Sequence, residues 1–134
     1  MTTTKADEKK PAIRIFKTRW FQRFARKNEI SDDSLRAAVA KAEKGLIDAD
    51  LGGGVIKQRI AKAGQGSSTG YRTVILYRKG DKAFFEFAFE KSQKDNLSKD
   101  EEKQYKEGAK HYLALTDKQL SELVKNGDLM EVKQ

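Results

Sequence analysis

The chain has 134 residues, a length that suits one domain with a single core, and it contains no cysteine. Its net charge of +8 and pI near 9.6 indicate a polyanionic partner: nucleic acid, the ribosome or an anionic membrane surface. The missing cysteine excludes disulfides, thiol catalysis and zinc–thiolate sites, and no apolar run approaches the roughly 20 residues that span a bilayer.

Residues 1–11 are polar and lack the apolar core of a signal peptide, so they are predicted to be a disordered leader before a single domain at 12–134. Ala12–Phe16 alternates apolar and basic residues, which predicts a short strand. Thr18 can cap a helix after it. One face of that helix is predicted to be buried and carries Trp20, Phe21, Phe24 and Ala25.

A second helix is predicted to begin at Ser31 or Asp32 and to end where glycines interrupt its pattern. Its expected buried residues are Leu35, Ala38, Val39, Ala42 and Leu46. Gly52, Gly53 and Gly54 then mark a turn.

Three strands are predicted next, at Val55–Ala61, Tyr71–Arg78 and Ala83–Phe89. A Gly/Ser loop separates the first two, and Gly80 and Asp81 form a hairpin turn between the last two. Because they are consecutive and closely spaced, the strands should form an antiparallel meander.

Two capping boxes predict the C-terminal helices: Ser98 with Glu101, and Thr116 with Gln119. A short extended segment is expected at Leu129–Val132. The predicted fold is therefore a small α+β domain, with an N-terminal strand and two helices, a three-stranded antiparallel meander and C-terminal helices, all packed on a curved antiparallel sheet.

The segment from Leu51 to Gly80 contains no acidic residue, although the chain has 20 of them. Lys57 and Arg59 lie two apart on a predicted strand, so both side chains should leave the same face. Such fixed cations suit phosphate binding, whereas the alternative is an ordinary solvated sheet face. The Gly/Ser loop at 63–70 lacks the spacing of a P-loop and reads as a flexible connection or, alternatively, a backbone phosphate cradle.

Other charged residues carry weaker signals. Arg19, Arg23 and Arg26 form one stripe on the first helix, either as a solvated face or as a second nucleic-acid contact. Lys91 and Lys94 follow the aromatic strand and could close the basic surface into a pocket. With no cysteine and His111 as the single histidine, neither a metal site nor a cofactor is expected, and the carboxylates form no catalytic pair.

Two motifs resemble the RelE/HigB family of toxins from type II toxin–antitoxin modules. They are K-x-R…G-Y-R-x-V-I-x-Y and the aromatic strand ending in F-x-K-S-x-x-x-N-L-S, and the resemblance covers about Ala12 to Leu115. It implies a RelE-like fold and a cytoplasmic enzyme that cleaves mRNA in the decoding site of the ribosome and is silenced by a cognate antitoxin. The implied chemistry is metal-free attack of a 2′-hydroxyl on the adjacent phosphate.

The resemblance also implies site residues. Lys57 or Arg59 would lie near the nucleophile, Arg72 would stabilise the phosphorane and Lys94 would lie near the leaving oxygen. Further RNA contacts would come from Lys62, Tyr71, Arg78, Lys91, Arg19 and Arg23. Ser98 stands where several members place a catalytic tyrosine or histidine, so the proton transfers would fall to the cations or to Tyr71.

Two alternatives stay open at this level: a ParE-like toxin that inhibits gyrase, and a non-catalytic RNA- or ribosome-binding module. The clustered cations favour RNA cleavage, because gyrase inhibition does not require them. The sequence leaves the oligomeric state and codon preference open, and no membrane partner is expected.

Overall fold

The computed structural model describes residues 12–62, 70–92, 94 and 96–133. The predicted leader at 1–11 and nearly all of the Gly/Ser loop lie outside these residues. Within the described ranges, no helix combines the length and apolar character that a membrane crossing requires.

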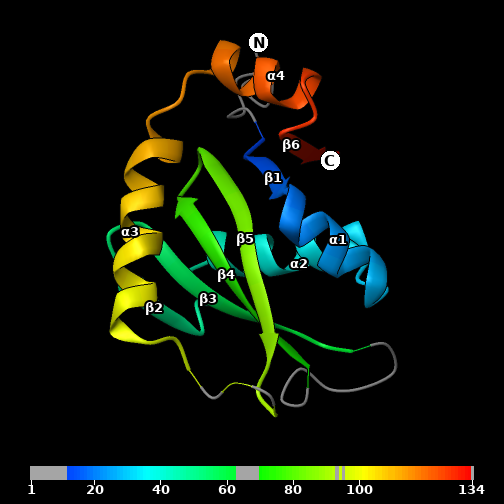
Figure 1. Ribbon diagram of the computed structural model, residues 1–134, viewed down its shortest axis with the longest axis vertical. Coiled ribbons are helices and arrows are strands. Elements are labelled where there is room, and N and C mark those ends of the chain that lie inside the picture. Colours follow the sequence, from blue (N-terminus) through cyan, green and yellow to red (C-terminus); the bar gives the residue numbers. More distant parts are fainter. Residues whose placement is uncertain (1–11, 63–69, 93, 95, 134) are drawn as a thin grey trace, which may run out of the picture.

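The chain forms four helices and six strands within these residues (Figure 1). The strands are β1 (Arg14–Thr18), β2 (Ala49–Gly52), β3 (Val55–Ile60), β4 (Tyr71–Arg78), β5 (Lys82–Glu90) and β6 (Leu129–Val132). The helices are α1 (Arg19–Lys27), α2 (Asp32–Glu43), α3 (Lys99–Leu113) and α4 (Asp117–Lys125).

All six strands join one sheet in the order β2-β3-β4-β5-β1-β6. The predicted meander is confirmed, and β2 extends it at one edge. The expectation of a purely antiparallel sheet was wrong, because β1 pairs with β5 in parallel. The long connection through α1 and α2 permits this pairing, which a tight turn could not make.

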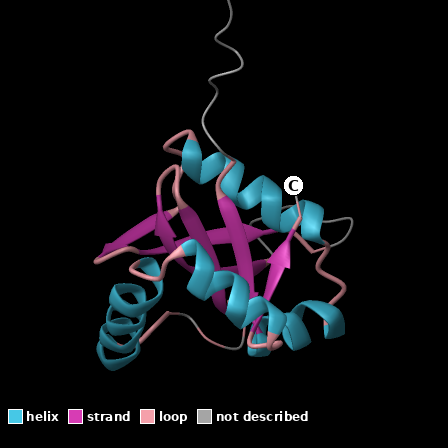
Figure 2. Ribbon diagram, turned by 90° about the horizontal axis from the view of Figure 1, so that it is seen from above, coloured by secondary structure: helices cyan, strands magenta, loops and turns pink. Residues whose placement is uncertain are grey.

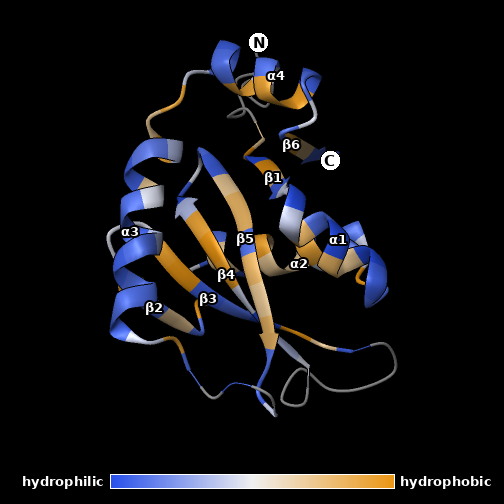
Figure 3. Ribbon diagram, in the orientation of Figure 1, coloured by the Kyte–Doolittle hydropathy of each residue, from blue (hydrophilic) through white to orange (hydrophobic). Residues whose placement is uncertain are grey.

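The sheet lies between two layers of helices (Figure 2). On one face α1 and α2 cover a core that includes Phe21, Leu35 and Phe85. On the other face α3 and α4 cover a second core that includes Phe84 and Leu120. The central strands are consequently apolar on both faces, and Figure 3 shows them in orange beside a mostly hydrophilic α3.

The helix starts agree with local sequence signals. Ser98 and Thr116 cap α3 and α4, and both predicted capping boxes are present. Thr18 and Ser31 cap α1 and α2 by accepting hydrogen bonds from backbone N–H groups in the first turn.

Two predicted core positions were wrong. Leu46 is 58% exposed, because α2 ends at Glu43 and the chain turns before Leu46 could continue the buried stripe. Trp20 is 38% exposed because it lies at the rim of the first core, whereas its neighbour Phe21 is fully buried.

Candidate functional site

Three of the predicted site cations meet on one face of the sheet. Lys57 and Arg59 alternate along β3, and Arg72 on β4 is the register partner of Arg59. Together with Asp48, Ala49 and Gln58, they line a hollow of about 200 Å³. That volume is several times the roughly 30 Å³ that one water molecule occupies in the liquid, so a phosphate group has room there.

Arg72 carries a buried donor that nothing satisfies. Among the described residues, its Nη1 is the one buried side-chain nitrogen or oxygen without a hydrogen-bond partner. A buried donor without an acceptor costs about 1–3 kcal/mol, and more when the group is charged. An anion that entered the hollow would remove this cost, so the guanidinium is suited to binding phosphate.

Arg59 is held by Asp48. One carboxylate oxygen accepts from the Arg59 backbone N–H at 2.7 Å, and the other accepts from the guanidinium at 3.1 Å. Burial alone would raise the pKa of Asp48, but these contacts outweigh it and hold that pKa below its usual value. The hollow therefore contains an ionised carboxylate that sequence reasoning missed, because β2 was not predicted and the acid-free segment begins after Asp48.

The segment before α3 borders the hollow. Lys57 Nζ donates to Asn96 Oδ1 at 2.7 Å, which joins β3 to this segment. Lys94 lies in the same segment, but its Nζ pairs with Glu101 Oε1 at 2.9 Å. The Ser98 backbone N–H and then Lys94 lower the pKa of Glu101, so the Lys94 partner stays ionised at neutral pH.

Tyr71 and Lys62 lie toward the opposite face of the sheet. The Tyr71 ring is buried edge-on against Phe24, and its hydroxyl donates to Asn28 Oδ1 at 3.3 Å. Lys62 Nζ lies 5.5 Å from the Tyr71 ring centroid and pairs with Glu90. Neither side chain joins the hollow, because strand residues one position apart leave opposite faces.

The remaining predicted RNA contacts are spread over the surface. Arg78 lies at the other end of β4, about 20 Å from Arg72 at the usual strand rise, and donates to the Leu113 carbonyl at 2.9 Å. Lys91 is exposed just after β5. Arg19 and Arg23 are exposed on α1, with Arg19 3.8 Å from Asp128. The structure does not bring these side chains to the hollow.

The model of the family described as RelE toxin of the RelE/RelB toxin–antitoxin system matches residues 13–132. The match spans nearly the whole chain. The protein belongs to the RelE toxin family. No curated protein matches the chain as an individual relative, so the family model carries the assignment.

Membership of the RelE family makes the chain the toxin of a toxin–antitoxin pair, and it implies a cognate antitoxin as partner. RelE-family toxins are typically ribonucleases. A cationic hollow with an unsatisfied arginine is consistent with that activity. His111 is exposed on α3, and among the described residues no three His, Asp or Glu side chains gather where they could hold a metal ion.

Glu86 is a further residue of this RelE-family toxin that sequence reasoning passed over. It lies in β5 among aromatic residues, and burial raises the pKa of its carboxyl. The Glu86 charge in turn helps to raise the pKa values of Tyr105 and Tyr112 on α3, after burial itself, and Tyr105 reaches about 12. An acid in the middle of an aromatic strand was the available signal. Tyr105 remains a neutral hydroxyl donor at physiological pH.

Proposed function

We propose that the protein is a ribosome-dependent endoribonuclease that cleaves mRNA in the decoding site and thereby stops translation in the cytoplasm. One observation carries the proposal: the buried, unpartnered Nη1 of Arg72 in a hollow that also contains Lys57 and Arg59. Three cations around one phosphate-sized space provide the charge that phosphoryl chemistry requires.

In the proposed reaction, the 2′-oxygen of the substrate attacks the adjacent phosphorus while the bond from phosphorus to the 5′-oxygen breaks. The 2′-hydroxyl loses its proton and the departing 5′-oxygen gains one. The products are a 2′,3′-cyclic phosphate, which can open to a 3′-phosphate, and a 5′-hydroxyl end. No external oxidant or co-reactant is needed, and the side chains supply the charge.

We assign Arg72 to the phosphorane, because its guanidinium is the group in the hollow that lacks a partner. Lys57 is assigned to the nucleophile in preference to Arg59, because Lys57 contacts the neutral amide of Asn96 whereas Arg59 is paired with Asp48. Lys94 is assigned to the leaving oxygen, a role that requires it to exchange Glu101 for the substrate. Asp48 positions Arg59, since a carboxylate with a lowered pKa is a poor general base.

The test compares wild type, Arg72→Ala and Arg78→Ala in a bacterial translation extract programmed with one defined messenger. The two arginines lie on the same strand, but Arg78 is remote from the hollow. Arg72→Ala should lower the cleavage rate roughly 10²- to 10³-fold, as removal of a transition-state donor does. Arg78→Ala should cleave like wild type.

New RNA ends should carry a 5′-hydroxyl, which can be ligated only after phosphorylation. Equal cleavage by wild type and Arg72→Ala would contradict the assignment of the site. Intact messenger with a halted ribosome would instead indicate a non-catalytic ribosome-binding protein. Intact transcripts with DNA damage in expressing cells would indicate a gyrase inhibitor.

A further inference from the structure

An exposed tryptophan begins a row of aromatic rings that leads toward the hollow. Trp20 is the single tryptophan of the chain and is 38% exposed. Its ring stacks on Phe24 at a centroid distance of 5.3 Å and lies 4.7 Å from Phe87. One part of the indole is therefore packed and oriented by two rings, while another part stays open to solvent.

The row continues on β5. Phe87 lies 6.0 Å from Phe89 and 6.2 Å from Tyr105. Phe89 is the register partner of Arg72 on the neighbouring strand. The rings thus connect Trp20 at the start of α1 with the strand beside the cations.

A bulge in β5 produces this arrangement. Val74 pairs with Phe87 and Ile75 pairs with Phe85, so Glu86 is the extra residue. The extra residue places Phe84, Phe87 and Phe89 on the same face, although Phe84 and Phe87 are three positions apart. Without the bulge, Phe87 would turn toward the opposite core.

The charge around the row suits RNA. α1 contains Arg19, Arg23, Arg26 and Lys27 and no acidic residue, and all four side chains are exposed. The cations of the hollow lie on the other side of the rings. Cations that follow a backbone, with aromatic rings between them, are how proteins hold single-stranded RNA.

We propose that Trp20 and Phe87 form a stacking platform for an unpaired nucleobase of the RNA strand whose phosphate lies in the hollow. The inference rests on the proposed function, because it places a nearby nucleotide of the same strand. The open part of the indole provides the stacking surface, and Phe24 and Phe87 hold it in place. The exposed arginines of α1 supply charge for the adjoining phosphates.

The test uses Trp20 as its own reporter, because no other indole contributes to the emission. The free toxin is titrated with a short single-stranded RNA that carries 2′-O-methyl groups and so has no nucleophile to react. A matched oligomer has the same phosphates but abasic sugars. The base-bearing oligomer should quench Trp20 fluorescence, and the abasic oligomer should leave it nearly unchanged.

Variants then separate stacking from charge. Trp20→Ala should bind labelled RNA roughly 5- to 150-fold more weakly, the cost of losing one stacked base, while Trp20→Phe should retain most of the affinity. The salt dependence of Trp20→Ala should match wild type, because no phosphate contact is lost. Arg72→Ala should instead lower the slope by about 0.7 per contact. Leu46→Ala, which removes the other exposed large apolar side chain of the described residues, should change nothing.

Three outcomes would overturn the platform: equal quenching by both oligomers, wild-type affinity in Trp20→Ala, or quenching by the antitoxin alone, which would assign Trp20 to a protein interface. None of these depends on cleavage. Failure of the proposed function would appear instead in the translation extract, where Arg72→Ala would cleave like wild type.

Discussion

Asp48 accepts from both the backbone and the guanidinium of Arg59, so a single carboxylate fixes one cation of the hollow and also reduces the local positive charge. These two effects act in opposite directions on RNA. A fixed Arg59 assists the reaction geometrically, whereas the negative charge of Asp48 opposes phosphate binding.

Asp48→Asn should separate the two effects. Without the negative charge, single-stranded RNA should bind about 2- to 5-fold more tightly at low salt, corresponding to about 0.5–1 kcal/mol for a partly exposed charge. Cleavage in the translation extract should become slower, because Arg59 loses its ionic tether. Measured KM and kcat should therefore fall together, and an unchanged kcat would show that Asp48 does not position Arg59.

At the scale of elements, the turn between β2 and β3 brings the hollow and α3 together. Gly52, Gly53 and Gly54 all have positive φ, and a Cβ at Gly54 would lie 2.8 Å from Leu113 Cδ1 on α3. The Gly54 carbonyl also accepts from the Tyr77 N–H at 2.8 Å. The turn therefore requires glycine for its backbone conformation and for the close approach of α3.

Gly54→Ala should destabilise the protein by about 2–4 kcal/mol, combining the cost of a left-handed alanine with a clash in the second core. Gly127→Ala is the matched control. Gly127 has φ +83, but a Cβ added there would meet nothing within 4 Å, so a loss of about 1 kcal/mol is expected. Urea unfolding measures both, and equal losses would mean that α3 yields to the added methyl group.

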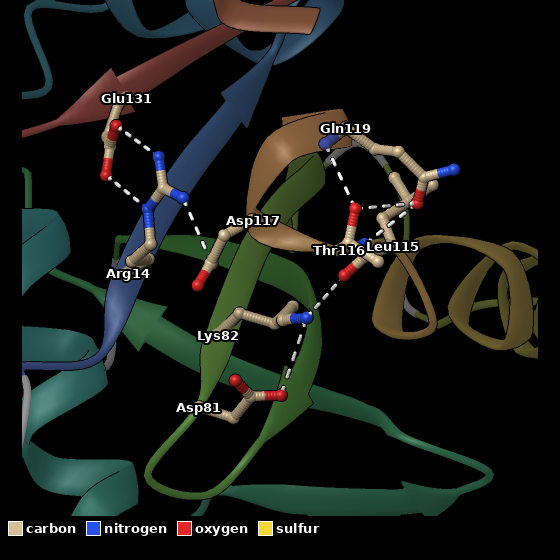
Figure 4. A network of polar contacts seen from close by, with 8 residues as sticks. All are labelled: Arg14, Asp81, Lys82, Leu115, Thr116, Asp117, Gln119 and Glu131. Carbon is tan, nitrogen blue, oxygen red and sulfur yellow. Dashed lines mark hydrogen bonds and ion pairs between the residues drawn. The ribbon is translucent and has the colours of Figure 1, made fainter. Parts of the chain in front are cut away.

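Over the whole molecule, a polar network joins the two ends of the chain (Figure 4). Arg14 on β1 donates to both carboxylate oxygens of Glu131 on β6 at 2.9 Å, and to Asp117 at the start of α4 at 3.2 Å. Nearby, Lys82 donates to the Leu115 carbonyl at 2.8 Å. These contacts attach α4 and β6 to the strand that pairs in parallel with β5.

The Arg14–Glu131 contact should make stability depend on pH. The Arg14 hydrogen bonds lower the pKa of Glu131, so their stabilisation is complete above the ordinary carboxyl pKa and is lost as pH falls through the folded-state value. Arg14→Met should cost about 1–2 kcal/mol at pH 7, for a partly buried bidentate pair. The difference from wild type should shrink in urea unfolding at pH 3.

Arg19→Met is the control for this measurement, because Arg19 and Asp128 are well exposed and 3.8 Å apart. Pairs of that kind contribute little, so its unfolding should match wild type at both pH values. A difference for Arg14→Met that did not change with pH would show that lost packing, rather than the ion pair, causes the destabilisation.

The sequence by itself determined the features that depend on near neighbours. The capping boxes of α3 and α4 join residues three apart, and the alternation of β3 puts Lys57 and Arg59 on one face, so both could be predicted from local pattern. Arg72 was predicted through its family motif, and the register between β3 and β4 brings it to the same hollow.

Only the tertiary structure decided which distant groups meet. It pairs Arg59 with Asp48, Lys62 with Glu90 and Lys94 with Glu101, so the acid-free stretch of sequence is not acid-free in space. It also places β1 parallel to β5 and introduces the bulge at Glu86 that turns Phe87 toward the RNA-facing side proposed above. These features follow from strand pairing and packing across long separations, where the energy belongs to the assembled sheet and leaves little trace in any short stretch of residues.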